Sequence, residues 1–147
     1  MPDYDDPAIE AEWCADQRTE VAAYLAEEEL VHGEIGEWPA WHIAPIVSVW
    51  AIESKKSPGW VGWWAICGDL PCDYVSADKI KHPRDAVRAI AEGWLEQSEL
   101  MARGETGADV SIGPPEAWSS LAPMLRSRAS SLLEMVNDDD VWTEDDL

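Results

Sequence analysis

The sequence IAPIVSVWAIESKKSPGWVGWWAIC occupies residues 43–67 and contains two β-rich runs on either side of a turn. β-Branched and aromatic residues dominate both runs, whereas residues 55–59 form the break Lys-Lys-Ser-Pro-Gly. Two such runs joined by a short connection with Pro and Gly are typical of a β-hairpin. We therefore predict that Ile46–Ile52 and Trp60–Ile66 pair as antiparallel strands.

Helical periodicity appears before and after this hairpin. From Pro7 to about Glu29, apolar residues recur at helical spacing, and Asp6 is the expected N-cap. Two further helices are predicted over residues 83–103 and 116–136, and Pro123 must either kink the last helix or begin its second part. The order of one helix, a small antiparallel sheet and two C-terminal helices predicts the α+β class.

The remaining segments are connections and one short strand. Residues 31–42 are rich in Gly, Pro and aromatic residues, which indicates an irregular connection. After a turn at residues 68–71, a third strand is expected at Cys72–Val75. The length and the hydrophobic content of 46% fit one domain over residues 1–147. Residues 137–147 are predicted to be a mobile acidic tail, with Val141 and Trp142 as residues that could dock.

Charge is distributed unevenly along the chain, whose formal net charge is −20. Residues 1–40 hold twelve Asp and Glu against one Arg, and residues 92–147 hold thirteen against three Arg. Residues 41–91 are nearly balanced, with five acidic and six basic residues. Because an anionic surface repels phosphate backbones and anionic lipids, we expect no nucleic-acid and no membrane partner, and we favour a basic protein.

The cellular location of the protein and the state of its cysteines are predicted from the N-terminal segment, the length of apolar runs and the cysteine spacing. The N-terminus has neither a basic segment nor an apolar one, and no run approaches the roughly 18 apolar residues of a membrane span, so we expect a cytoplasmic protein. Cys14, Cys67 and Cys72 match no paired Cys-x-x-Cys spacing. We therefore predict reduced thiols, with neither a disulfide nor a structural zinc site.

Tryptophan is the main aromatic residue, with ten Trp and no Phe in the chain. In the second strand of the hairpin, Trp64 shares a face with Ile66, whereas Trp63 lies on the opposite face, so most indoles are expected to fill the core. Three others occupy turns rich in Gly and Pro, where a large side chain is more often exposed, and they are candidates for a binding surface: Trp38, Trp41 and Trp60.

The leading functional hypothesis is a non-enzymatic module that binds or inhibits a basic partner, as toxin-immunity proteins and nucleic-acid mimics do. Several carboxylates of the first helix lie away from its apolar stripe and can face such a partner. These candidate contact residues are Glu10, Asp16, Glu20, Glu27 and Glu28. A further alternative is that the acidity serves solubility alone.

A competing hypothesis is an enzyme or small-ligand-binding domain. Its Trp-lined pocket would be formed by the loop of residues 32–42 and the turn of residues 68–73. The residues proposed to line it are His32, Glu34, Glu37, His42, Asp69 and Asp73. The same histidines with Cys67 or Asp69 contain metal-ligand types, but they lack spacings such as H-E-x-x-H, so we assign no metal and no cofactor.

Several phrases of the sequence resemble one small bacterial family. They are Trp13-Cys14, HGEIGEWPAWH at residues 32–42, IESKKSPGWVGWW at residues 52–64 and GDLP at residues 68–71. Through these phrases the chain resembles the family catalogued as domain of unknown function 4826. The resemblance implies a bacterial, cytoplasmic protein, and it supplies no catalytic residues.

Overall fold

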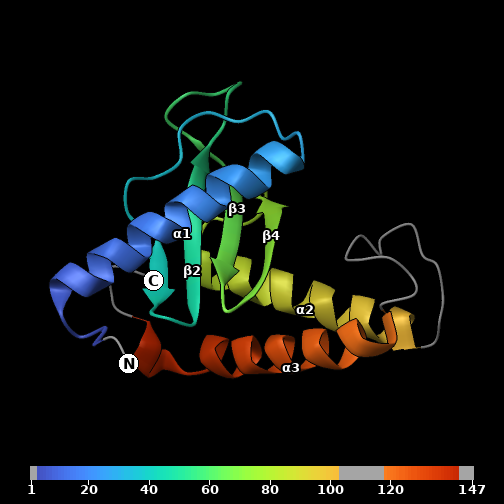
Figure 1. Cartoon of the computed structure of the whole chain (residues 1–147). Coiled ribbons are helices and arrows are strands. Elements are labelled where there is room, and N and C mark those ends of the chain that lie inside the picture. Colours follow the sequence, from blue (N-terminus) through green and yellow to red (C-terminus); the bar gives the residue numbers. More distant parts are fainter. Residues whose placement is uncertain (1–2, 103–117, 143–147) are drawn as a thin grey trace. The chain divides into compact units, whose positions relative to one another are not determined.

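The computed structural model of this chain describes residues 3–102 and 118–142 (Figure 1). The described residues separate into two compact units, 3–86 and 87–142, with the boundary in the first turn of helix α2 (Pro83–Ala102). The chain runs through helix α1 (Pro7–Glu27), a four-stranded antiparallel sheet, helix α2 and helix α3 (Trp118–Val136). The predicted α+β class is therefore confirmed.

Helix α1 (Pro7–Glu27) begins at the predicted position. The Asp6 carboxylate accepts a hydrogen bond from the backbone N–H of Ala8 at 2.9 Å, which satisfies one of the free donors of the first turn. The helix buries one side, formed by Cys14, Gln17, Val21 and Leu25. Gln17 was not expected on this side. It is accommodated because the buried Ser48 hydroxyl lies 3.1 Å from its amide oxygen.

The predicted hairpin is confirmed by the antiparallel pairing of β2 (Val47–Glu53) with β3 (Val61–Gly68). The third strand is longer than expected, because β4 (Leu70–Ser76) begins immediately after Asp69. Gly68 makes this tight turn possible, since its φ of 151° is a conformation that residues with a Cβ rarely adopt. The prediction that the turn includes residues 70 and 71 is therefore wrong.

A fourth strand lies where we predicted an irregular connection. Strand β1 (Trp41–Ile43) pairs with the start of β2, and the order in the sheet is β1-β2-β3-β4. Further upstream, the backbone N–H of Gly36 donates to the carbonyl of Ala51, and Ile35 forms an isolated bridge with Ile52. Residues 33–43 therefore follow the edge of β2 despite their Gly and Pro, because that edge offers unpaired backbone groups.

The core of the first unit lies between α1 and one face of the sheet, across which α1 runs (Figure 1). Val21 and Leu25 of α1 pack in one buried cluster with four residues of the central strands, which are Trp50, Ile52, Ala65 and Cys67. Trp64 faces the other way and donates its indole N–H to the carbonyl of Ile80 at 2.8 Å. The predicted division of Trp63 and Trp64 between the two faces agrees with this arrangement.

The second unit is helical. Buried residues of α2 recur at helical spacing from Val87 through Trp94 to Met101, and α3 (Trp118–Val136) is one helix that contains Pro123. The 3-10 turn Asp139–Val141 follows, and the buried Trp142 donates its indole N–H to the carbonyl of Met135 at 2.9 Å. Residues 143–147 of the predicted tail lie outside the described part of the chain. None of the described helices is long and apolar enough to cross a membrane.

The cysteines differ from the prediction of three reduced thiols. Cys67 of β3 and Cys72 of β4 form a disulfide, with their Cα atoms 4.4 Å apart, whereas Cys14 is free and buried. The five-residue separation resembles no familiar motif, but the tight turn at Asp69 places the two cysteines beside each other on neighbouring strands.

Candidate functional site

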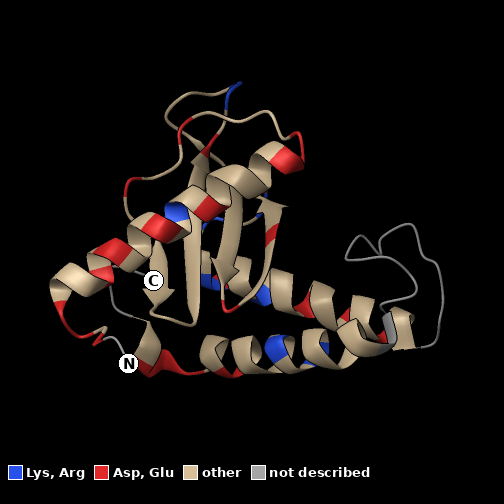
Figure 2. Ribbon diagram, in the orientation of Figure 1, with Lys and Arg blue, Asp and Glu red and all other residues tan. Residues whose placement is uncertain are grey.

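The exposed side of α1 carries a row of carboxylates, Glu12, Asp16, Glu20 and Glu27, which we call the acidic stripe. Figure 2 shows acidic residues along the length of α1, with a single basic residue between them. Glu12, Asp16 and Glu20 are successive neighbours at four-residue spacing. Like charges at this spacing repel each other by about 0.2–0.5 kcal/mol per pair in isolated helices. The stripe is therefore a source of repulsion within the helix.

The single basic residue of α1 is Arg18, and it serves the backbone of another segment. Its Nε donates to the carbonyl of Gly36 at 2.9 Å, and its Nη2 donates to the carbonyl of Ile35 at 2.8 Å. These bonds satisfy carbonyls where residues 33–43 depart from regular strand geometry. The guanidinium is thus engaged away from the stripe, whose negative charge it does not neutralise by contact.

A hollow of about 460 Å³ lies beside the stripe. Six residues of α1 line it together with two from the following segment, and these eight are Ala11, Cys14, Ala15, Arg18, Thr19, Ala22, Glu37 and Trp38. Trp38 is 50% exposed, so a large apolar surface meets solvent next to the row of carboxylates. A row of charges beside a partly apolar hollow is typical of surfaces that bind other proteins.

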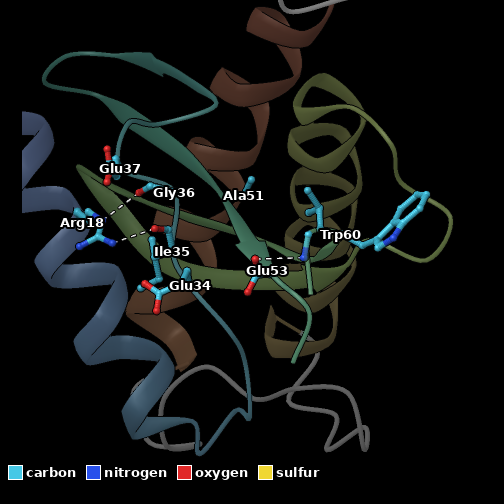
Figure 3. Close-up of a pocket in the computed structure, with 10 residues that line it drawn as sticks. Arg18, Glu34, Ile35, Gly36, Glu37, Ala51, Glu53 and Trp60 are labelled. Carbon is cyan, nitrogen blue, oxygen red and sulfur yellow. Dashed lines mark hydrogen bonds between the residues drawn. The ribbon is translucent and has the colours of Figure 1, made fainter. Parts of the chain in front are cut away.

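A second pocket, of about 340 Å³, shares Arg18 and Glu37 with the first hollow (Figure 3). Three carboxylates line it, Glu34, Glu37 and Glu53, and Figure 3 shows Arg18 and Trp60 at opposite ends. The backbone N–H of Gly59 donates to the Glu53 carboxylate at 3.2 Å, which ties the hairpin loop to the pocket. Trp60 is 74% exposed and extends away from Arg18.

The six residues of the predicted pocket are not brought together. Glu34 and Glu37 do line the second pocket, but the turn of residues 68–73 lies at the far end of β3 from the Val61 end that borders it. An eight-residue strand at about 3.3 Å per residue separates the two ends by roughly 25 Å. The Nδ1 of His32 lies 2.6 Å from the carbonyl of Gly33.

His42 belongs to a different cluster, which fastens α1 to β1. Its Nε2 lies 3.1 Å from a carboxylate oxygen of Glu10, and its ring packs between Trp13 and Trp38 at centroid distances of 6.1 and 5.5 Å. The carboxylate of Glu10, which we predicted to contact a partner, is therefore engaged by His42 of the same chain. Glu28 is similar, because it accepts a hydrogen bond from the Tyr24 hydroxyl at 3.3 Å.

The three tryptophans predicted to be exposed divide into two groups. Trp38 and Trp60 are exposed, whereas Trp41 is only 4% exposed because it is the first residue of β1 and packs into the core. Trp41 is therefore not available to a partner. Sequence reasoning also missed Glu12 as a member of the stripe, although its four-residue spacing from Asp16 was a usable signal.

Two side chains of α1, the buried Cys14 and the partly buried Tyr24, have raised pKa values. Burial raises the pKa of the Cys14 thiol from 9.0 to about 11, and the negative charge of Glu10 adds to this rise. Burial also raises the pKa of Tyr24, with smaller contributions from the charges of Asp73 and Glu28. Both side chains stay neutral at physiological pH. Cys14 is consequently a poor nucleophile, which argues against a catalytic role.

Metal-ligating side chains do meet at one place that the sequence did not indicate. Within the described residues, ligand atoms of Glu20, Cys67 and Cys72 all lie within 4.8 Å of one another. The histidines considered as ligands from the sequence are not part of this group. The three ligand residues come from three separate elements, α1, β3 and β4, so no local sequence motif predicts the group.

The protein is thus of the α+β class, with an anionic helix beside a partly apolar hollow. Its family follows from comparison with known proteins. Residues 7–142 match the family described as Domain of unknown function (DUF4826), and the chain belongs to that family. No curated protein and no solved structure matches the chain.

Proposed function

We propose that this protein is a non-enzymatic module that binds a basic protein partner through the acidic stripe of α1 and the hollow beside it. The observation that carries the proposal is the exposed row Glu12, Asp16, Glu20 and Glu27, which no cation of α1 neutralises. Cationic side chains of a partner would relieve the repulsion within this row. They would also be attracted from a distance, because the formal net charge of the chain is −20.

The hollow offers apolar contacts to a partner, which charge alone does not provide. Exposed charges mainly accelerate encounter, whereas the lifetime of a complex depends on apolar groups that are buried at its centre. Trp38 offers a half-exposed indole at the rim, and the alanines of α1 leave room for an inserted side chain. The partner best suited to this surface therefore has basic residues around one apolar or aromatic side chain.

The test compares two variants that change the net charge equally. One carries Glu12→Gln, Asp16→Asn and Glu27→Gln in the stripe, and the matched control carries Glu92→Gln, Glu96→Gln and Glu99→Gln on the exposed side of α2. Each is used to capture proteins from a bacterial lysate at low and at physiological salt. We expect the wild-type chain and the α2 variant to retain the same basic protein, and the α1 variant to lose it.

Folding of the α1 variant is checked by its melting temperature. Because its substitutions remove the neighbouring like charges Glu12–Asp16 and Asp16–Glu20, the variant should be at least as stable as the wild-type chain. Equal capture by the two variants would contradict the proposal: retention by both would show that the stripe makes no contact, and loss by both would show that only net charge matters.

The 340 Å³ pocket supports a second candidate function, the binding of a small cation. Its three carboxylates would attract a guanidinium or ammonium group. Titration calorimetry with N-acetylarginine amide and with the matched neutral N-acetylcitrulline amide tests this function. Binding of the arginine derivative alone, weakened by Glu34→Gln, is expected, whereas equal signals from both amides would exclude it.

A further inference from the structure

Cys67, Cys72 and Glu20 form a cluster on the face of the sheet that α1 covers. Cys67 is fully buried, Cys72 is partly buried and Glu20 is exposed, so the cluster extends from the core to solvent. The two Sγ atoms and a carboxylate oxygen of Glu20 all lie within 4.8 Å of one another. Glu20 is therefore the donor of this cluster that faces solvent.

The chemistry of the three donors changes with the oxidation state of the cysteines. In the disulfide seen here, neither sulfur carries the negative charge that a metal ligand needs. Once reduced, the pair offers two thiolates, and Glu20 adds a carboxylate. Two thiolates and a carboxylate suit Zn²⁺, which takes four ligands in tetrahedral geometry, with bonds of about 2.3 Å to sulfur and 2.0–2.2 Å to oxygen.

Glu20 is available for such a role. Across residues 3–102 and 118–142, no hydrogen bond and no ion pair holds its carboxylate elsewhere. The other members of the acidic stripe, by contrast, are not grouped with the sulfur atoms. Hard cations such as Mg²⁺ and Ca²⁺ prefer sites made of oxygen alone, so the two sulfurs select a thiophilic ion from the cations that this anionic surface attracts.

We propose that the reduced protein binds Zn²⁺ through Cys67, Cys72 and Glu20, with a water molecule as fourth ligand, and that oxidation releases the ion. On binding, the two thiols lose their protons to solvent and each thiolate donates an electron pair to zinc. A low-molecular-weight disulfide then oxidises the pair. The Cys67–Cys72 bond forms, the sulfur–sulfur bond of the oxidant breaks, its two sulfurs take up protons as free thiols, and Zn²⁺ leaves.

The test measures the affinity of the full chain for Zn²⁺ by competition with a chromophoric chelator, with the protein reduced and then oxidised. We expect one ion per reduced chain and at least 100-fold weaker binding to the oxidised chain, more than the 10–100-fold that loss of an outer-shell partner costs. Cys72→Ser should behave like the oxidised chain. Cys14→Ser is the matched control and should bind as tightly as the wild-type chain.

The role of Glu20 is tested separately from that of the sulfurs. Glu20→Gln should weaken Zn²⁺ binding by about 10-fold or more, whereas Glu27→Gln, on the same side of α1, should leave it unchanged. With Co²⁺ as a probe, the reduced chain should show thiolate-to-metal charge-transfer absorption that Cys72→Ser loses. Because Cys72 is only partly buried, circular dichroism is expected to show that this variant is folded.

Two results would overturn the proposal. The first is equal affinity of the reduced and oxidised chains for Zn²⁺, which would assign binding to surface carboxylates. The second is a reduced chain with no charge-transfer absorption on adding Co²⁺. Neither result bears on partner binding, since the stripe variant described above keeps Glu20.

Discussion

Cys14 lies on the buried side of α1, where its thiol is held neutral, and this has a measurable consequence for stability at alkaline pH. In the unfolded chain the thiol ionises around pH 9.0, whereas in the folded protein its pKa is about 11. The neutral Cys14 thiol therefore contributes fully to the free energy of unfolding below pH 9. This contribution is lost as the pH rises from 9 to 11, because the thiol ionises first in the unfolded chain. A difference of two pKa units corresponds to about 3 kcal/mol.

We therefore expect Cys14→Ala to flatten the fall in stability between pH 9 and pH 11. The measurement is urea unfolding at several pH values, with the free energy of unfolding of the variant compared with that of the wild-type chain. Both chains retain the contribution of Tyr24, whose raised pKa acts in the same direction, so only the difference between the two chains reports on Cys14. Identical pH dependence in both chains would refute this assignment.

Substitution of Gly68 tests whether its backbone conformation requires glycine, and substitution of Gly93 is the matched control. A Cβ on Gly68 would meet Val47 Cα at 2.9 Å and would overlap the carbonyl of Ile46, and the φ of 151° is strained for other residues. We expect Gly68→Ala to destabilise the protein by at least 1–3 kcal/mol, roughly the cost of one such backbone conformation. Gly93 lies in helix α2 with open space around its Cβ position.

Gly93→Ala should accordingly stabilise the protein by up to about 1 kcal/mol, because Ala is the better helix former. The measurement is the urea midpoint of unfolding of each variant, compared with that of the wild-type chain. A Gly68→Ala variant as stable as the wild-type chain would show that the β3–β4 turn is not held in the conformation described.

At the scale of elements, the hairpin was predictable because its signals are local. The β-rich runs of residues 43–53 and 60–67 and the break between them specify two antiparallel strands, and Asp6 with Pro7 specifies the start of α1. Strand β1 was not predictable, because its Gly and Pro neighbours read as a loop. Its regular conformation comes from backbone pairing with the start of β2 across the turn at residues 44–46.

The candidate site was partly predictable for the same reason. The acidic face of α1 follows from helical periodicity, and Trp38 and Trp60 were expected to be exposed. The contact between Glu10 and His42 joins residues 32 positions apart, and the cluster of Glu20 with the two cysteines joins three elements. Such long-range contacts depend on the tertiary structure and leave no pattern in the sequence.

For the whole molecule, a net charge of −20 implies that repulsion limits stability. Raising the ionic strength from about 0.01 M to 0.15 M shortens the Debye length from about 30 Å to about 8 Å and screens this repulsion. We expect the melting temperature to rise over this range. One unfolding transition is also expected if residues 1–147 form a single domain, as the sequence predicts. A melting temperature that does not change with salt would argue against a repulsive surface.

We propose that the acidic stripe of α1 steers a basic partner to this protein. The most direct measurement is the association rate constant of the captured partner at increasing salt, for the wild-type chain and for the α1 and α2 variants. We predict that the α1 variant associates at least about 10-fold more slowly at low salt and with a weaker salt dependence, while the α2 variant resembles the wild-type chain. Equal association rates for the α1 and α2 variants at every salt concentration would contradict the claim.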